Sequence, residues 1–251
     1  VRTASSNESC IDVLHLKVAC GTADSRSAPA MTEEQMNAAL QVGRKCVADE
    51  ISNRGACAVC IGEVGIGNTT SAAALLVALT GADASECCGR GTGLDDAGVQ
   101  NKVTSVRKAC SQHAIAIQSN ESAEKQAQEA LRTVGGLEFA AMVGAYMEAA
   151  DKHIVAVVDG FISGVAALCA AKIQPACREN MIFATNLAEE PSSTKGGEIL
   201  TAALKAKAAL SMDLALGETS GAALAVPLLR SAAAIITRMG TLEEVQALVK
   251  T

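Results

Sequence analysis

Short apolar runs recur along the chain, and longer alanine-rich segments separate them. The clearest run is 154–158, where five consecutive apolar residues end at an Asp-Gly pair and predict a buried strand. The runs 56–62 and 181–185 predict two further strands in the same way. The segment 11–18 alternates weakly between apolar and polar residues, a pattern compatible with a fourth strand.

Helices are predicted between these runs. Thr32 followed by Gln35 is the pattern of a capping box, in which each side chain bonds the backbone of the other residue, and it predicts a helix to about residue 50. A second helix is expected to begin at residue 69 or 70 and to end near Gly81. Further helices are predicted at 95–118, 122–134, 138–152 and 160–171 and over most of the chain beyond 197, with breaks at 217–221 and 240.

Strands that alternate with helices predict an α/β fold: a three-layer, doubly wound, mostly parallel sheet flanked by Ala-rich helices, as in Rossmann-like proteins. The composition supports this class, because hydrophobic residues make up 49% of the chain and aromatic residues only 2%. Such a core consists of small aliphatic side chains, which let helices approach a sheet closely. We expect residues 20–251 to form this domain and residues 1–19 to be a tail or an incomplete strand segment.

Charge and hydropathy argue against two classes of partner. The formal net charge is −6, and the chain has no basic run and few aromatic residues, so nothing favours nucleic acid. The apolar segment 72–79 is too short to cross a bilayer, and no signal-peptide core is visible, so we expect no membrane span. The chain begins with Val1 rather than Met, and a targeting peptide removed earlier would leave no trace.

The chain contains ten cysteines. Cys46, Cys57, Cys60, Cys110 and Cys169 lie in apolar stretches, where a free thiol behaves as a small hydrophobic group. Cys57 and Cys60 have the spacing of a metal or redox pair, but they fall in a run that we interpret as a buried strand, and no second ligand pair follows. We therefore expect reduced thiols, no metal, and a reducing compartment, either the cytoplasm or an organelle matrix or stroma.

The segment 62–70 follows a predicted strand and precedes a predicted helix. Its closely spaced glycines allow a tight turn and close approach of the backbone to a ligand, and the helix start offers unpaired N–H groups. A structural strand–helix turn with a threonine or asparagine N-cap fits the pattern equally well. If the segment is a phosphate cradle, its candidate binding residues are Gly65, Gly67, Asn68, Thr69 and Thr70.

A second glycine-rich loop spans 89–93 and offers Gly91, Thr92 and Gly93 as candidate anion-binding residues. Lys102 lies on the helix that follows, and its ammonium group is a suitable point charge for a phosphate. The alternative is a lysine on the solvated side of that helix.

Three carboxylates stand at breaks in the apolar pattern. Glu63 stands at the end of the predicted strand that precedes the first glycine loop, where a carboxylate has no obvious structural role. Asp159 follows the clearest strand and suits either a ligand hydroxyl or the N-cap of the next helix. Glu218, preceded by Gly217, lies between apolar segments whose burial would raise the pKa of a carboxylate toward that of a general base. A helix-breaking loop with a Glu near the helix start is the alternative.

Six motifs together resemble the nicotinate-nucleotide–dimethylbenzimidazole phosphoribosyltransferases, which build the lower ligand of cobamides. They occur in the family's order over about residues 20–245. Any one of them is weak, and the ordered set is specific. The motifs are PAMT at 29–32, GEVGIGNTT at 62–70, GRGTG at 89–93, GGLEFAAM at 135–142, DGFIS at 159–163 and LGETSGAA at 216–223.

The resemblance implies a reaction in which Glu218 removes a proton from a benzimidazole-type base, which then attacks nicotinate mononucleotide and releases nicotinate. It implies that Glu63 lies near the reacting ribose or base. The two glycine loops and Lys102 would hold the nucleotide phosphate, with Asp159 and Gly217 also binding substrate. It further implies a homodimer with no cofactor.

The sequence also departs from the family pattern in places. The substantial segment that normally precedes the Gly-Thr motif, matched here at Gly21 and Thr22, is missing, and segment 184–190 lacks the usual His and Ser. Two interpretations stay open. The chain is either a phosphoribosyltransferase, alone or completed by a partner that covers the missing segment, or a non-catalytic homologue that serves as a structural or binding subunit.

Overall fold

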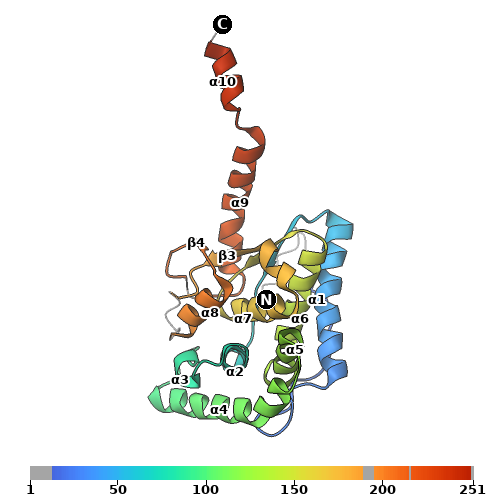
Figure 1. The fold of residues 1–251 in the computed structure, drawn as a ribbon, viewed down its shortest axis with the longest axis vertical. Coiled ribbons are helices and arrows are strands. Elements are labelled where there is room, and N and C mark those ends of the chain that lie inside the picture. Colours follow the sequence, from blue (N-terminus) through green and yellow to red (C-terminus); the bar gives the residue numbers. More distant parts are fainter. Residues whose placement is uncertain (1–12, 189–194, 215, 250–251) are drawn as a thin grey trace, which may run out of the picture.

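The computed structural model describes residues 13–188, 195–214 and 216–249 (Figure 1). Its described strands are β1 (Ala58–Ile61), β2 (Val155–Val158), β3 (Met181–Thr185) and β4 (Ala208–Leu210). The described helices are α1 (Glu33–Arg54), α2 (Asn68–Thr80), α3 (Ala84–Cys87), α4 (Asp96–Gln118), α5 (Ala123–Val134), α6 (Leu137–Asp151), α7 (Phe161–Ile173), α8 (Gly196–Leu204), α9 (Ser220–Arg238) and α10 (Leu242–Val249), with a short 3-10 helix η1 (Pro175–Asn180).

The strands form one parallel sheet in the order β1-β2-β3-β4. The predicted α/β fold, with a parallel sheet flanked by helices, is therefore confirmed. The described strands follow one another in chain order, without the reversal of direction that a doubly wound sheet has. Right-handed crossovers then place the connecting helices on the same face of the sheet.

Side chains of alternate strand residues enter two separate apolar clusters. On one face, Val158 and Phe183 join the main core beneath the connecting helices. On the other face, Val157 and Ala184 pack against the first turns of α9, through Ala222 and other small residues. The sheet thus lies between two helical layers, and among the described residues one of these layers comes from the start of α9.

Some local predictions are corrected. Residues 13–18 of the expected strand 11–18 are irregular and mostly exposed, and the rest of that segment lies outside the described residues, as do residues 189 and 190 of segment 184–190. Neither β4 nor α3 was predicted, because three and four residues are too short for a periodic signal. The capping box of Thr32 and Gln35 is confirmed, and α1 continues from it to Arg54.

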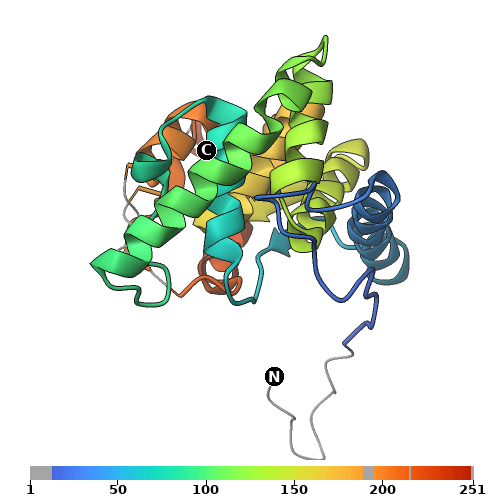
Figure 2. The same cartoon turned by 90° about the horizontal axis from the view of Figure 1, so that it is seen from below.

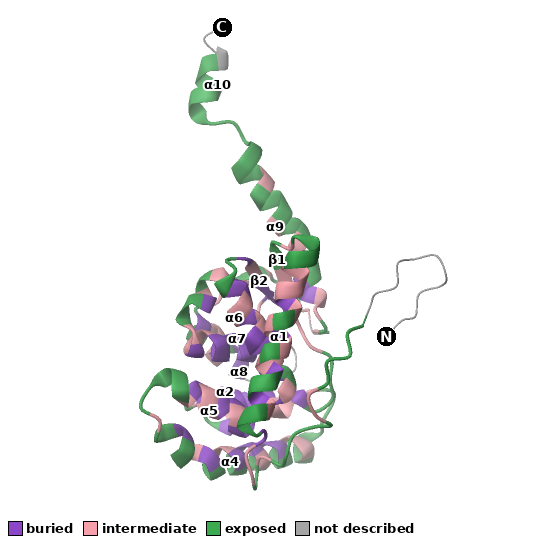
Figure 3. Ribbon diagram, turned by 90° about the vertical axis from the view of Figure 1, so that its right-hand side faces the viewer, coloured by how far each residue is buried: buried purple, intermediate pink, exposed green. Residues whose placement is uncertain are grey.

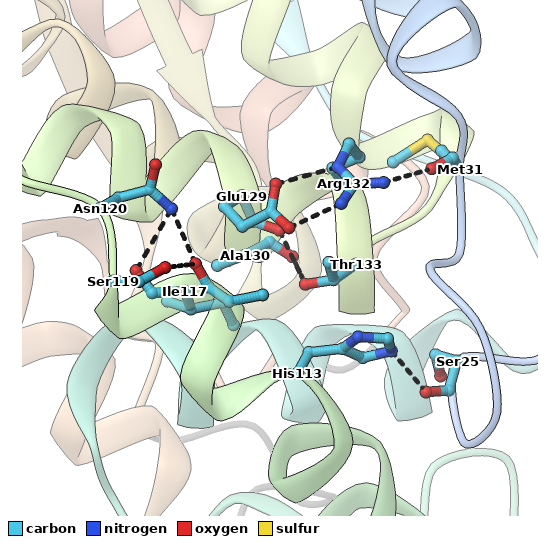
Figure 4. Close-up of polar contacts among 11 residues, drawn as sticks. Ser25, Met31, His113, Ile117, Ser119, Asn120, Glu129, Ala130, Arg132 and Thr133 are labelled. Atoms are coloured by element: carbon cyan, nitrogen blue, oxygen red, sulfur yellow. Dashed lines mark hydrogen bonds and ion pairs between the residues drawn. The ribbon is translucent and has the colours of Figure 1, made fainter.

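The low aromatic content has the expected effect on packing. Helices α1 and α6 lie side by side so closely that a methyl group on Gly43 would overlap the carbonyl oxygen of Ala141. The chain before α1 is held in place by backbone bonds from Ala30 to Thr133 and from Met31 to Arg132. The guanidinium group of Arg132 also donates to the carbonyl oxygen of Met31 at 3.4 Å (Figure 4). A ring nitrogen of the buried His113 on α4 bonds the carbonyl oxygen of Ser25 at 2.9 Å in the same region.

The cysteines agree with the prediction of free thiols but not with the predicted burial of Cys57 and Cys60. The nine described cysteines are free thiols. Cys57 and Cys60 are exposed rather than buried, and β1 is an edge strand of the sheet that the structure describes. Burial raises the pKa of Cys87 and of Cys110 to about 12, so these thiols stay protonated at neutral pH.

Helix α9 leaves the body of the molecule after its first turns, and α10 continues at its far end (Figures 1 and 3). Figure 2 shows the molecule from below, relative to Figure 1. In this view α4 crosses the near side of the molecule, which faces away from α9 and α10. Among the described helices, α9 alone is long and apolar enough to cross a bilayer by length and composition, which is weak evidence for a span; 17% of that stretch is buried. We call α9 and α10 together the arm. Its described exposed residues include the large apolar residues Leu224, Leu228, Ile235, Ile236, Met239 and Leu242.

Candidate functional site

A cleft of about 180 Å³ opens at the carboxyl ends of the strands. The register explains its position: Ile61 pairs with Val158, so the residues that follow each strand emerge side by side. In parallel sheets, ligands bind at this edge. The lining residues are Gly62, Glu63, Val64, Gly65, Asn68, Thr69, Gly91, Thr92, Asp159, Gly160, Phe161, Ile162, Ser163, Leu216, Gly217 and Glu218.

The first glycine loop joins β1 to α2 along one side of this cleft. Gly67 has φ 85° and is the N-cap of α2, so it adopts a left-handed conformation that glycine accepts readily. It offers no side chain to cap the first N–H groups of α2, and the first turn of α2 has no acidic residue. Unpaired N–H groups and the positive helix end therefore favour an anion at this position.

Two polar side chains of the loop bond each other. The amide nitrogen of Asn68, which is 9% exposed, donates a short hydrogen bond to the carboxylate of Glu63. Glu63 and Asn68 are consequently held by each other, and Asn68 does not act as the N-cap of α2, which is Gly67. This contact gives Glu63 a local structural role that the sequence did not suggest.

Lys102 of α4 ties the two glycine loops together. Its Nζ donates to Oγ1 of Thr69 at 3.0 Å and to the carbonyl oxygen of Gly89 at 3.1 Å. Lys102 is only 6% exposed, and desolvation lowers its pKa. The alternative of a solvated helix lysine is therefore wrong, because the helix that carries Lys102 turns this residue into the protein rather than toward water.

Glu218 stands on the opposite side of the cleft, in the turn before α9. The three consecutive residues Gly217, Glu218 and Thr219 have φ of 69°, 54° and 68°. Left-handed conformations are unfavourable for residues with a Cβ. The turn is closed by Ser220, whose N–H and hydroxyl both donate to the carbonyl oxygen of Gly217, at 2.9 and 2.6 Å. Glu218 is exposed to the cleft as a result.

Asp159 is 3% exposed and lies under this turn. Its Oδ2 accepts from the N–H of Thr219 at 3.0 Å, and its Oδ1 accepts from the N–H of Ala222 at 2.8 Å. The capping role considered for Asp159 is thus real but applies to α9, whereas the next helix in the chain is α7. The backbone of Asp159 is also fixed, since the hydroxyl of Thr185 donates to its carbonyl oxygen at 2.7 Å.

The cleft brings together most of the candidate residues from three distant parts of the chain. Lys102 reaches it through Thr69, while Gly67, Thr70 and Gly93 support the two loops without lining the cleft. Sequence reasoning did not single out the apolar lining residues Val64, Phe161, Ile162 and Leu216. In the sequence, only their positions near candidate polar residues, within three of the six motifs, indicate a place in the site.

The arrangement has a definite chemical character. One side offers hydroxyls and helix N–H groups, with the Lys102 ammonium group bonded to one of these hydroxyls, and these groups suit a phosphate. The other side offers a carboxylate that can accept a proton. Apolar side chains lie between them, which suits a flat aromatic group. Among the residues that the structure describes, no group of three or more His, Cys, Asp or Glu side chains is placed to hold a metal ion.

Comparison with known proteins adds a family to this geometry. Residues 2–247 match a protein-family model described as phosphoribosyltransferase. A relative named nicotinate-nucleotide–dimethylbenzimidazole phosphoribosyltransferase from Pseudomonas putida is 47% identical over 232 residues, which is 92% of this chain and 62% of that protein. A relative of the same name from Pseudomonas aeruginosa is 44% identical over 242 residues, covering 96% of this chain and 65% of that protein.

Solved structures agree with the sequence relatives. A crystal structure of CobT from Thermus thermophilus superposes with a TM-score of 0.83 at 34% identity, covering 97% of this chain and 69% of that chain. The chain thus spans somewhat less than two thirds of the length of the curated relatives it matches.

Proposed function

This chain belongs to the phosphoribosyltransferase family, and we propose that it transfers the phosphoribosyl group of nicotinate mononucleotide to a benzimidazole-type base. The product is an α-ribotide that serves as the lower ligand of a cobamide. One observation carries the proposal: an anion-binding side anchored by Lys102 and a carboxylate, Glu218, face the same cleft. A phosphorylated sugar and a base that must lose a proton require this combination.

The proposed reaction uses one proton transfer and one substitution. Glu218 accepts the proton from one nitrogen of the benzimidazole-type base while the other nitrogen attacks the anomeric carbon of the ribose. A carbon–nitrogen bond forms as the bond to nicotinate breaks, and nicotinate leaves with the electron pair of that bond. The attack comes from the face opposite the leaving group, which converts a β-nucleotide into an α-ribotide.

The nucleotide phosphate occupies the cradle at the start of α2. Gly65, Asn68 and Thr69 border this position, and Gly91 and Thr92 of the second glycine loop line the same cleft. Lys102, whose ammonium group bonds the Thr69 hydroxyl, supplies the positive charge that compensates the phosphate. Glu63 is held by Asn68 near the ribose end, where a carboxylate suits the sugar hydroxyls better than the phosphate.

The acceptor base lies on the Glu218 side, against the apolar lining residues. Val64 and Leu216 are 79% and 70% exposed, which leaves apolar area free for a flat aromatic ring. A base with a nitrogen within reach of Glu218 and an apolar second ring fits this side of the cleft. Purely polar bases leave the same side chains in contact with water.

The direct test is to incubate the chain with nicotinate mononucleotide and dimethylbenzimidazole and to follow α-ribazole phosphate by liquid chromatography. Product formed by the wild type and lost with Glu218→Gln supports the proposal. Binding of neither substrate and no product would overturn it, and would favour the alternative of a non-catalytic subunit.

The projecting arm supports a further part of the proposal, a homodimer. Helix α9 leaves several apolar side chains in water, and exposed apolar patches of this kind mark protein interfaces. In sedimentation experiments we expect a dimer that Ile236→Glu weakens, whereas Ser231→Glu, which adds the same charge to the same helix, leaves it intact. A monomeric wild type would contradict this part. The free described thiols fit a reducing compartment such as the cytoplasm.

A further inference from the structure

Helix α9 begins without a cap of its own. Its N-cap residue, Thr219, has φ 68° and makes no side-chain hydrogen bond to the first turn. The first N–H groups of a helix need acceptors from elsewhere. Two of them, from Thr219 and Ala222, bond the carboxylate of Asp159, which lies 60 residues or more earlier in the chain. A residue of β2's end therefore does what a neighbouring Ser or Asp does for most helices.

The same two bonds fix the turn that carries Glu218. Non-glycine residues in the left-handed region keep that conformation only where surrounding contacts hold them. Here two of three successive left-handed residues, Glu218 and Thr219, carry side chains. The hydrogen bond from Thr219 to Asp159 lies immediately after Glu218, so it acts directly on the backbone that aims the Glu218 side chain.

The fit around Asp159 leaves little freedom. A methyl group on Gly221 would overlap Cγ2 of Thr185 and would lie 3.2 Å from Oδ1 of Asp159. Thr185 in turn bonds the Asp159 carbonyl oxygen. The ends of β2 and β3 and the first turn of α9 are thus held together at this point. Each carboxylate oxygen of Asp159 accepts one backbone N–H, from Thr219 or from Ala222.

We infer that Asp159 is a positioning residue: its buried carboxylate holds the left-handed turn before α9 and thereby aims Glu218 into the cleft. This inference rests on the proposed function for its catalytic consequence. Asp159 then differs from a substrate ligand, because its two carboxylate oxygens are engaged by backbone groups. Losing it should slow the chemical step and leave nucleotide binding almost unchanged.

The first experiment needs no activity. Asp159→Asn replaces one acceptor oxygen by an amide group that cannot accept from an N–H. We expect backbone hydrogen exchange at Thr219 and Ala222 to accelerate at least about tenfold, the loss typical of a hydrogen bond to a charged group. Asp83→Asn is the matched control, since Asp83 caps α3 through the N–H of Ser85 at 2.8 Å, away from the cleft. Unchanged exchange at Thr219 and Ala222 overturns the inference.

The second experiment separates positioning from substrate binding. In Asp159→Asn we expect kcat to fall about 100-fold, as for a misplaced catalytic group, with the dissociation constant of nicotinate mononucleotide changed less than about threefold. Adding Thr219→Gly should restore at least about tenfold in kcat, because glycine adopts the left-handed conformation without cost. A large loss of nucleotide affinity without rescue by Thr219→Gly would mean that Asp159 binds substrate directly.

These outcomes are distinguishable from failure of the proposed function. If the wild type makes no α-ribotide, the proposed function fails, while the hydrogen-exchange comparison still decides whether Asp159 holds the turn. If Asp159→Asn does not fold, Asp159→Ser replaces it, because serine is smaller and keeps one acceptor for a backbone N–H. The same exchange and rescue criteria then apply.

Discussion

The two sides of the cleft are built in different ways. On the side proposed to bind phosphate, Lys102 is buried and bonds groups of both glycine loops, and these elements lie within about 40 residues of one another in the chain. On the opposite side, Glu218 is exposed on a left-handed turn, and its position depends on Asp159 from another strand. The side proposed to bind phosphate is locally assembled, whereas the side proposed to react depends on a contact between distant segments. Binding and catalysis should therefore fail separately.

The largest expected effect is on the reacting side. Glu218→Gln keeps the size of the side chain and removes its ability to accept a proton. We expect kcat to fall about 10²- to 10⁴-fold, the usual contribution of a general base, with nucleotide affinity unchanged. Initial rates and calorimetric titration with nicotinate mononucleotide measure the two quantities. A variant that keeps more than a tenth of wild-type kcat would show that the base is another group.

On the binding side, Lys102→Met should have the reverse signature. Removing a charge-assisted contact to phosphate should weaken nucleotide binding by about 10- to 100-fold. Lys108→Met is the matched control, because Lys108 lies on the same helix and is exposed. Titration calorimetry measures both variants. Equal affinities for the two would remove Lys102 from the phosphate site.

Gly221→Ala tests the packing beneath the Glu218 side of the cleft. Its methyl group would overlap Cγ2 of Thr185, so we expect the free energy of unfolding to drop by about 1–3 kcal/mol, as for other overpacked sites. Gly240→Ala is the control, since its nearest neighbour is the end of a flexible Glu244 side chain at 3.4 Å. Urea unfolding measures both. If Gly221→Ala is as stable as the control, the close approach of α9 to β3 is not required.

The smallest expected effect concerns pH. Desolvation lowers the pKa of Lys102 below 10.5, so between the lowered value and 10.5 the unfolded chain binds more protons than the folded chain. Stability contributed through this group therefore rises with pH in that window. The difference in unfolding free energy between wild type and Lys102→Met should shift in favour of the wild type from neutral pH to about pH 10. A difference independent of pH would mean that Lys102 titrates as in water.

Local signals in the sequence predicted much of the fold. The runs at 154–158 and 181–185 correspond to β2 and β3, and the capping box of Thr32 begins α1. These features depend on neighbouring residues. Strand β4 was missed because a three-residue strand carries no period, and the burial of Cys57 and Cys60 was overestimated because no local pattern says which strand lies at a sheet edge.

The site divides in the same manner. The glycine loops were recognisable because each contains its own turn and helix start. The burial of Lys102 was not, since a helical lysine is usually solvated and only the packing of α4 against α2 turns it inward. The bonds between Asp159 and α9 join residues 60 and 63 positions apart, and nothing in either segment identifies the other. Only the ordered set of motifs placed them in one site.

The chain has no Trp and a single Tyr, and this scarcity has a practical consequence. Tyr146 is 1% exposed, and its hydroxyl donates to the carbonyl oxygen of Ser163, a residue of the cleft wall, at 3.2 Å. The intrinsic near-ultraviolet emission of the protein therefore comes almost entirely from one ring beside the cleft. Tyr146 therefore offers a single-site reporter, within the native protein, of changes at the Ser163 wall of the cleft.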